Sequence, residues 1–333
     1  VHALAVHPLH GDVSAAIRRL AVRDVVHDPR VIERLEQRSL TLESRPIRSG
    51  ADELHRDRLA LGAIPRAVDG SHPARSNEAL DLETVRDDLP EVDIAVDPLE
   101  GTNLCANGLP GALAVLAVAH KGHLLNAPDT YMSKIACGPE GKGKISLDKS
   151  PRDNLWALAA AKGLRPDELT VVVLDRPRHE RLIHELRAAG ARILLVTDGD
   201  VAPVVATCIP KSGIDMVYGI GGAPEGVLGA AAVHCMGGEF QGKLQFRSPE
   251  ERERAVTMGM KDPDQVLTVS DLVRGDVLFV ATGVTTGPLL KGVRRLGNRL
   301  HLQSLALRST TGTIRWVNTD VDAHRYIHEY EHA

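Results

Sequence analysis

From residue 91 onward, short apolar runs alternate with segments rich in glycine and charge, and this alternation constrains the fold more than any other feature of the chain. Short runs of β-branched and other apolar residues bounded by turn residues are typical of buried strands. A segment with helical spacing, 178–189, ends at Gly190 between two such runs and predicts a βαβ unit. We therefore expect a layered α/β architecture with a mixed sheet. The expected strands are 92–96, 111–119, 169–174, 191–196, 214–218, 277–281, 302–307 and 313–317.

Residues 1–90 differ in composition from the rest of the chain. They contain 13 Arg and 6 His but no Lys, Phe, Trp or Tyr, whereas the remainder carries all 10 Lys and all 9 aromatic residues. Helical spacing is present only at 14–23 and 31–38. We therefore divide the chain into an atypical N-terminal region, 1–90, and an α/β region, 91–333. Three interpretations of the first region remain open: a polar helical segment, a poorly ordered segment, or a segment unrelated to the domain that follows it.

The composition favours a globular protein that acts on a small molecule. A chain of 333 residues with 43% hydrophobic residues can bury a substantial core. Its longest apolar run, 112–119, is far shorter than the roughly 20 residues of a membrane span. A net charge of -4 and 3% aromatic residues argue against a nucleic-acid partner. The four cysteines are widely spaced, which indicates neither a disulfide framework nor a thiolate zinc site, so we expect a cytoplasmic protein without a membrane partner.

A DPLEGT segment follows the first expected strand. Its two carboxylates, Asp97 and Glu100, lie three residues apart at a strand-to-turn corner and can converge on one hard divalent cation. The Leu99 carbonyl is a further oxygen ligand, and such ligands suit Mg²⁺ or Mn²⁺. The backbone N–H groups of Gly101 and Thr102 can approach an anion that the metal also binds. The alternative is an Asx-type turn with a solvated glutamate.

A second motif, GIGGAPEG at 219–226, precedes an apolar, helix-like run at 227–236. Glycines before a helix N-terminus provide an anion site, and Glu225 adds a carboxylate in the first turn. The motif is not a dinucleotide fingerprint, because Pro224 occupies the position of the third glycine. The GPEGKGK segment at 138–144 is likewise no Walker A loop, since it lacks the Gly-Lys-Ser/Thr ending. A nicotinamide-dependent oxidoreductase is therefore the least favoured class.

Two further polar clusters follow the strands 169–174 and 191–196. Guanidinium groups at a strand end suit bidentate contacts with phosphate, and carboxylates there can hold sugar hydroxyls or a metal. Each cluster alone is also typical of a charged loop or a capped turn. Together the clusters lie where open α/β sheets bind ligands. The first cluster is Arg176, Pro177 and Arg178, the second is Asp198, Gly199 and Asp200, and the histidines that we expect on the surface or in the core are His120, His123 and His179.

Six stretches of residues 91–318 resemble class II fructose-1,6-bisphosphatases, the bacterial branch of the lithium-sensitive sugar and inositol phosphatase superfamily. DPLEGT alone is typical of the superfamily, whereas GIGGAPEG together with LNAPDTY points to the class II enzymes. The stretches occur in the order of the family. They are EVDIAVDPLEGTNLCANGLPGALAVLA, LLNAPDTYMSKIACGP, RPRHE, VTDGDVA, DMVYGIGGAPEGVLGAA and LFVATGVTTGPLLKGV.

The resemblance implies a layered α/β/α/β sugar-phosphatase fold with mixed sheets. It implies hydrolysis of the 1-phosphate of fructose 1,6-bisphosphate in gluconeogenesis, with Mg²⁺ or Mn²⁺ as cofactor. We expect a homo-oligomer, as is common for metabolic enzymes. By resemblance Asp97, Glu100 and Glu225 are the metal ligands, and Asp97, Glu100 and Thr102 are catalytic. The substrate-binding positions that it implies are Glu100, Gly101, Thr102, Tyr131, Arg176, Pro177, Arg178, Asp198, Gly199, Asp200 and Gly222.

The N-terminal region departs from this family. The family carries a G-x-G-D-K-type segment and a G-E-G-E…D-E-A-P-M-L segment there, and residues 1–90 contain neither. The abrupt change at residue 91 leads to the hypothesis that this region has been replaced or is read in a different frame. Two alternatives to an active fructose bisphosphatase stay open. One is a protein that binds sugar phosphate or metal without turnover, because metal-binding carboxylates are missing. The other is a phosphatase for sedoheptulose 1,7-bisphosphate or inositol phosphates.

Overall fold

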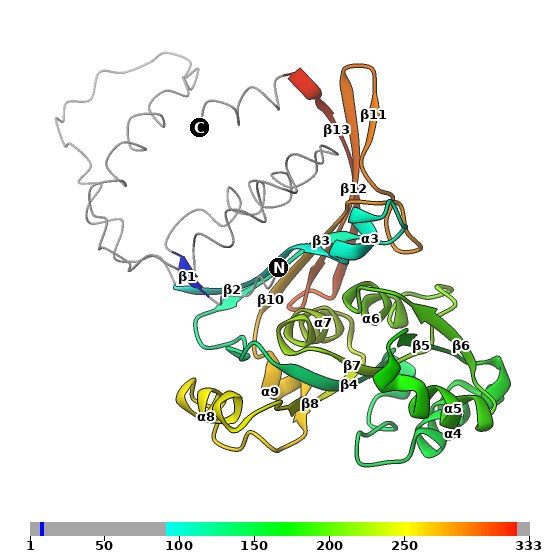
Figure 1. Ribbon diagram of the computed structural model, residues 1–333. Helices are drawn as coiled ribbons and strands as arrows, with labels where there is room; N and C mark the ends of the chain where they lie inside the picture. Colours follow the sequence, from blue (N-terminus) through cyan, green and yellow to red (C-terminus); the bar gives the residue numbers. More distant parts are fainter. Residues whose placement is uncertain (1–6, 10–90, 325–333) are drawn as a thin grey trace. The chain divides into compact units, whose positions relative to one another are not determined.

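The computed structural model describes residues 7–9 and 91–324, which belong to one compact unit built on two sheets (Figure 1). The expected N-terminal region, with its helices at 14–23 and 31–38, lies outside the described residues apart from 7–9. The segment 131–268 forms one sheet and is inserted between the two chain portions that form the other. Within the described ranges, no helix has the length and apolar character needed to cross a membrane.

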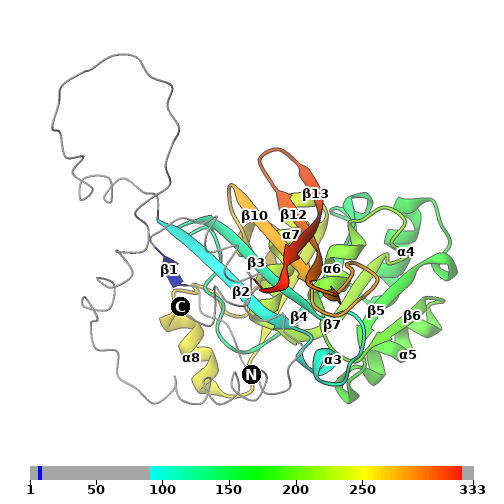
Figure 2. The same cartoon turned by 90° about the horizontal axis from the view of Figure 1, so that it is seen from above.

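The first sheet has seven strands and is antiparallel throughout. They are β1 (His7–Leu9), β2 (Val92–Glu100), β3 (Leu113–His120), β10 (Val277–Gly283), β11 (Arg294–Leu296), β12 (Arg299–Arg308) and β13 (Thr313–Asp322). Their order is β1-β2-β3-β10-β12-β11, and β13 pairs with β12. A turn at Gly312 joins β12 to β13 in a long hairpin, coloured orange to red in Figures 1 and 2, and a φ of 58° there suits glycine.

The second sheet has six strands and is mixed, as expected. They are β4 (Tyr131–Cys137), β5 (Thr170–Leu174), β6 (Arg192–Val196), β7 (Met216–Gly222), β8 (Glu239–Gln245) and β9 (Leu267–Thr268), in the order β6-β5-β7-β4-β8-β9. β5 runs parallel to β6 and β7, and the other pairs are antiparallel. The expected βαβ unit is β5, α5 (Glu180–Ala188) and β6.

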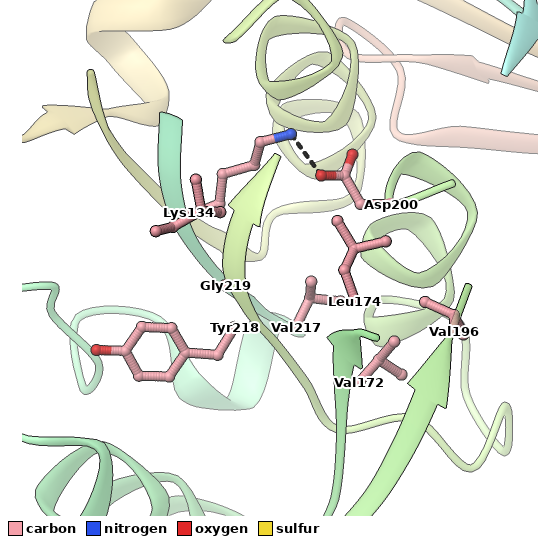
Figure 3. A pocket seen from close by; sticks show the side chains of 9 residues that line it. Lys134, Val172, Leu174, Val196, Asp200, Val217, Tyr218 and Gly219 are labelled. Carbon is pink, nitrogen blue, oxygen red and sulfur yellow. Dashed lines mark hydrogen bonds and ion pairs between the residues drawn. The ribbon is translucent and has the colours of Figure 1, made fainter. Parts of the chain in front are cut away.

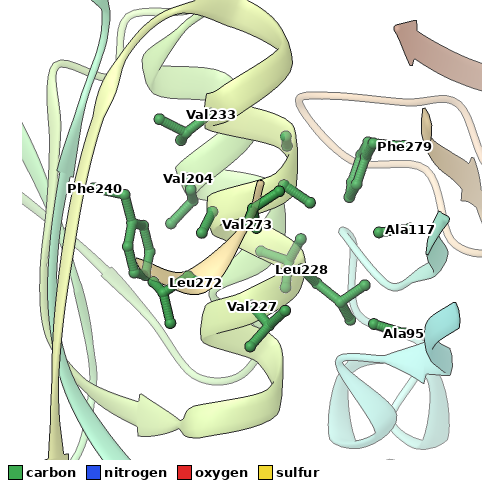
Figure 4. Packing of buried hydrophobic residues seen from close by; sticks show 14 of the residues in the cluster. Ala95, Ala117, Val204, Val227, Leu228, Val233, Phe240, Leu272, Val273 and Phe279 are labelled. Atoms are coloured by element: carbon green, nitrogen blue, oxygen red, sulfur yellow. The ribbon is translucent and has the colours of Figure 1, made fainter. Parts of the chain in front are cut away.

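Helices α6 (Val201–Thr207) and α7 (Ala223–Met236) form the layer between the sheets. Almost every residue of α7 is buried, which fits a helix that is apolar on all sides. Leu228 of α7 lies in one cluster with Phe240 of the six-stranded sheet and Phe279 of the seven-stranded sheet (Figure 4). On the other face of the six-stranded sheet, α4 (Pro151–Lys162) and α5 contribute Leu155 and Leu186 to a second core. The α/β/α/β order of layers is thereby confirmed.

The structure also contains elements that the sequence pattern did not predict. β4 was not predicted because the buried Lys134 interrupts its apolar pattern, and β8 was not predicted because a glycine, Gly242, takes one of its three buried positions. The expected strand 214–218 continues through Gly222, so the GIGG glycines lie in β7. The shorter elements are α3 (Thr102–Ala106), η2 (Pro139–Gly141), η3 (Pro166–Glu168), η4 (Pro177–His179), α8 (Pro249–Thr257) and α9 (Val269–Leu272).

Candidate active site

Five carboxylates from three parts of the chain gather at the junction of the two sheets. Asp97 and Glu100 come from β2 of the seven-stranded sheet. Asp198 and Asp200 come from the turn between β6 and α6, and Glu225 lies in the first turn of α7. Electrostatic coupling of Asp97 and Glu100 to the other carboxylates shows that they form one cluster.

Two hydrogen bonds join the β2 segment to the turn before α6. Glu100 Oε1 accepts the backbone N–H of Val201 at 3.0 Å. Asp198 Oδ2 accepts the backbone N–H of Asn103, also at 3.0 Å. The backbone amide at the start of α6 therefore stabilises the ionised form of a glutamate from the other sheet.

Glu100 is the last residue of β2, at a strand-to-turn corner as expected, whereas Asp97 lies at an irregularity within the strand. The pairing register of β2 with β3 shifts between Asp97 and Glu100, as in a β-bulge. Asp97 Oδ1 accepts the N–H of Leu99 at 3.0 Å, and the Thr102 hydroxyl donates to the Leu99 carbonyl at 2.9 Å. Gly101 then takes a φ of 79°, which glycine adopts without strain, and the chain enters α3.

Burial and mutual repulsion disfavour negative charge on these carboxylates. Burial, followed by the nearby charges of Glu225, Asp198 and Asp200, raises the pKa of Asp97 to about 7. The pKa of Glu100 is raised well above its usual value, chiefly by burial and then by Asp200 and Asp97. Burial likewise raises the pKa of Glu225. Without a cation the cluster is therefore prone to bind protons at neutral pH.

The chemistry of this cluster fits a hard divalent cation. Glu100 is only 2% exposed, and its Oε2 has no hydrogen-bond partner among the described residues. An orphaned carboxylate oxygen among repelling carboxylates is an environment that Mg²⁺ or Mn²⁺ would relieve. No three His, Cys, Asp or Glu side chains in the described part of the chain are arranged as a complete metal-binding group. The fit therefore rests on charge, burial and the orphaned oxygen.

A buried lysine, which the sequence analysis did not identify, lies beside this cluster. Lys134 Nζ contacts Asp200 Oδ2 at 2.6 Å, with only 2% of the lysine side chain exposed (Figure 3). A small cavity lies next to the pair and is otherwise lined largely by apolar side chains such as Val172 and Leu174. The sequence contains a signal for the burial of this lysine. With the two-residue period of a strand, Lys134 shares one face of β4 with Met132 and Ala136, both of which are buried.

One of the two predicted arginines, Arg176, contacts a carboxylate of the cluster, and the other, Arg178, contacts a backbone carbonyl and an aromatic ring. Arg176 Nη2 is 3.5 Å from Asp198 Oδ1. Pro177 begins η4, and after it Arg178 Nη2 donates to the Ile220 carbonyl at 2.8 Å. The Arg178 guanidinium carbon is 5.0 Å from the centre of the Tyr131 ring, a cation–π contact.

His179 is a buried structural histidine, which agrees with the expectation of a surface or core role. Its Nδ1 lies 2.7 Å from the Leu174 carbonyl, and its Nε2 accepts the backbone N–H of Ile220 at 2.7 Å. These contacts require the neutral imidazole with its proton on Nδ1. Burial lowers the pKa of His179, which agrees with that state. The histidine thus fixes the backbone at Ile220, and the Ile220 carbonyl in turn accepts hydrogen bonds from Arg178.

The GIGG glycines allow carboxylates to approach the backbone, a role that the sequence did not predict, while the expected anion binding at these glycines stays a prediction. A Cβ on Gly222 would lie 1.9 Å from Glu225 Oε2, and one on Gly221 would lie 2.0 Å from Asp200 Oδ2. A Cβ on Gly199 would lie 2.9 Å from Glu100 Oε2. Gly222 also pairs with Tyr131 across β7 and β4, so the backbone joins the aromatic ring to the carboxylates.

Comparison with known proteins agrees with the resemblance. Residues 80–321 match the model of the bacterial, glpX-encoded fructose-1,6-bisphosphatase family, slightly more than the expected 91–318. The chain is 46% identical over 247 residues to a D-fructose 1,6-bisphosphatase class 2/sedoheptulose 1,7-bisphosphatase of Synechocystis sp., covering 70% of this chain and 71% of the relative. It is 47% identical over 244 residues to the protein of that name from Synechococcus elongatus, covering 69% and 71%. The chain therefore belongs to the bacterial fructose-1,6-bisphosphatase family encoded by glpX.

Proposed function

We propose that this protein hydrolyses the 1-phosphate of fructose 1,6-bisphosphate to give fructose 6-phosphate and phosphate, in a reaction that depends on Mg²⁺ or Mn²⁺. The observation that carries the proposal is the buried carboxylate cluster with the orphaned Glu100 Oε2, together with Arg176, which contacts Asp198, and Arg178, which contacts the Tyr131 ring. In such a site, groups that would hold a metal and groups that would bind a phosphate can act on one substrate. Family membership and the names of the relatives support the same reaction.

Asp97, Glu100 and Glu225 are the residues that we propose to hold the metal, with the Leu99 carbonyl beside them. The cation would supply positive charge to the phosphoryl oxygens and acidity to a water. The protein itself contributes in two ways. Burial of the carboxylate side chains limits the access of bulk water to them, and the backbone N–H of Val201 keeps Glu100 oriented toward the cluster.

The remaining predicted residues are proposed to bind and orient the sugar bisphosphate. Asp198 and Asp200, with Gly199 between them, accept hydrogen bonds from sugar hydroxyls, and Lys134 holds Asp200 in place. Arg176 and Arg178 bind the phosphate that does not react, so that its binding energy positions the reacting one. The other proposed contacts are the backbone of Gly101, Pro177 and Gly222 and the hydroxyls of Thr102 and Tyr131.

A second candidate substrate is sedoheptulose 1,7-bisphosphate. The relatives carry both activities in their names, and that observation favours it as an additional substrate. Competition between the two bisphosphates for one site, measured as mutual inhibition of phosphate release, tests whether the chain accepts both. We further propose a cytoplasmic, homo-oligomeric enzyme of gluconeogenesis. The four cysteines, all free, are compatible with a reducing compartment.

The deciding experiment is phosphate release from fructose 1,6-bisphosphate by the full chain with Mg²⁺ or Mn²⁺. We expect EDTA and Glu100→Gln each to abolish release. Glu253→Gln is the matched control, because Glu253 is an exposed residue of α8, and this variant should retain activity. Release that persists in EDTA contradicts metal dependence. A folded chain that binds fructose 6-phosphate in calorimetry but releases no phosphate would establish the binding protein without turnover.

A further inference from the structure

A second arginine, Arg247, contacts the Tyr131 ring. Neither the motifs nor the family resemblance identified this residue. The Arg247 guanidinium carbon lies 5.3 Å from the centre of the Tyr131 ring, close to the 5.0 Å of Arg178. We propose that Arg247 completes a subsite for the non-reacting phosphate monoester of the substrate, together with Arg178 and Tyr131. This inference rests on the proposed function and deepens it.

Three separate chain segments bring these side chains together. Tyr131 is the first residue of β4, and it pairs with Gln245, the last residue of β8. Arg247 follows two residues after the end of β8, while Arg178 comes from η4. The subsite therefore lies at the strand ends of the six-stranded sheet. At the same edge, Gly222 ends β7 and Glu225 lies in the first turn of α7.

Arg247 is held in place without any ligand. Its Nε donates to Glu251 Oε1 at 2.7 Å, and its backbone N–H donates to Glu251 Oε2 at 2.8 Å. The same Oε2 accepts the hydroxyl of Thr130, the neighbour of Tyr131, at 2.9 Å. These bonds lower the pKa of Glu251 to about 2, so the carboxylate stays charged and keeps the guanidinium oriented. At 57% exposure, the Arg247 side chain still faces solvent.

The two guanidinium groups at this ring have partners of different kinds. Arg247 is paired with Glu251 and is also electrostatically coupled to Asp129, whereas Arg178 donates both Nε and Nη2 to the neutral Ile220 carbonyl. In the part of the chain that the structure describes, no carboxylate lies within ion-pair distance of Arg178. Two guanidinium groups beside one ring repel each other, and an anion in contact with both would remove that repulsion. A phosphate dianion has enough terminal oxygens to accept from the guanidinium N–H groups that these bonds leave over and from the tyrosine hydroxyl.

The subsite predicts specificity for the phosphate that stays on the sugar. Fructose 6-phosphate carries that group alone, whereas fructose 1-phosphate carries only the reacting group. Arg247→Gln should therefore weaken binding of fructose 6-phosphate by at least about tenfold, as expected for a lost charge-assisted contact. It should raise KM for fructose 1,6-bisphosphate by a similar factor with kcat nearly unchanged. Turnover of fructose 1-phosphate should not change.

The test is calorimetry with fructose 6-phosphate and steady-state kinetics with both phosphates, on the full chain. Arg252→Gln is the matched control, because Arg252 lies on the same helix and pairs with Asp264. It should change neither quantity. Arg247→Lys keeps a positive charge without the planar fork and should give an intermediate loss, which serves if Arg247→Gln does not fold.

The outcomes separate this subsite from the proposed function. Equal fructose 6-phosphate affinity in Arg247→Gln and the unsubstituted chain overturns the subsite, as does an equal loss with fructose 1-phosphate. Failure of the unsubstituted chain to bind fructose 6-phosphate also overturns it. A chain that hydrolyses neither phosphate but binds fructose 6-phosphate through Arg247 would refute the proposed turnover and retain the subsite.

Discussion

The substitution Lys134→Met should destabilise the protein far more than the same substitution at an exposed lysine. The substitution Lys134→Met keeps a long apolar stem but removes the ammonium group that contacts Asp200 at 2.6 Å. Side-chain exposures of 2% for the lysine and 11% for the aspartate place the pair in the interior. Asp200 would then be an uncompensated charge near Glu100 and Glu225, to which it is electrostatically coupled.

The expected loss follows from that burial. Breaking a buried ion pair by removing one partner costs about 3–5 kcal/mol, which is a large part of the ~5–15 kcal/mol that stabilises a typical domain. The same substitution in an exposed pair, Lys121→Met, should cost no more than ~1 kcal/mol. Lys121 contacts Glu91, and the two side chains are 56% and 41% exposed. The two variants therefore differ in burial while sharing the chemical change.

Urea unfolding followed by circular dichroism measures both losses in the metal-free protein. The double variant Lys134→Met/Asp200→Asn completes the comparison, because it removes both charges and should recover a substantial part of the stability. A loss below ~1 kcal/mol for Lys134→Met would refute the inference that the lysine neutralises the cluster. Additive losses in the double variant would show that the two side chains do not depend on each other.

The other predictions concern protons, backbone contacts and the N-terminal region. Burial raises the pKa of Asp97 from 3.8 to about 7, so between these two pH values the folded state holds a proton that the unfolded state has lost. The metal-free protein should therefore lose up to ~4 kcal/mol of stability as the pH rises from 3.8 to about 7. Mg²⁺ should therefore raise the melting temperature more at pH 8 than at pH 5, and equal shifts would contradict this. The pKa of His179 lies below its usual 6.5, so its contribution to stability is present above pH 6.5 and is lost as the pH falls below it. His179→Phe should lose ~1–3 kcal/mol because the Ile220 N–H loses its acceptor, and urea unfolding at pH 7.5 checks this. Gly222→Ala places a methyl group against the Glu225 carboxylate and should abolish metal-induced stabilisation, measured by thermal melting. If residues 1–90 are read in a different frame, another frame of the upstream nucleotide sequence encodes the missing family motifs, and their absence from all frames rejects that hypothesis.

The sequence predicted the elements whose residues follow one simple period. β5, β6 and β10 are nearly continuous apolar runs, and their expected and observed bounds differ by at most two residues. β4 was missed, because the ion pair with Asp200 allows Lys134 to occupy a core-facing position where an apolar side chain is expected. The glycines of β7 were assigned to a loop, since the contacts that make them necessary come from carboxylates elsewhere in the chain.

The site was predictable in its residue types and less so in its geometry. Strand ends drew attention to Asp97, Glu100 and Arg178, and the structure places carboxylates and guanidinium groups together there. The bulge that presents Asp97 depends on pairing with β3, which local sequence does not reveal. Arg247 was overlooked because it lies in a charged segment that resembles an ordinary solvated helix, and its contact with Tyr131 exists only after β4 and β8 have paired.

Two hydrogen bonds, which Glu100 accepts from Val201 and Asp198 accepts from Asn103, make the site depend on both sheets at once. Each bond has one partner near the end of β2, in the seven-stranded sheet, and the other in the turn that follows β6 of the six-stranded sheet. A recombination event that exchanged the inserted segment 131–268 would leave Asp97 and Glu100 in place but would replace Asp198, Asp200 and Glu225. An exchanged segment would therefore restore the site only if it also reproduced the backbone N–H of Val201 and the carboxylate of Asp198 at these two contacts.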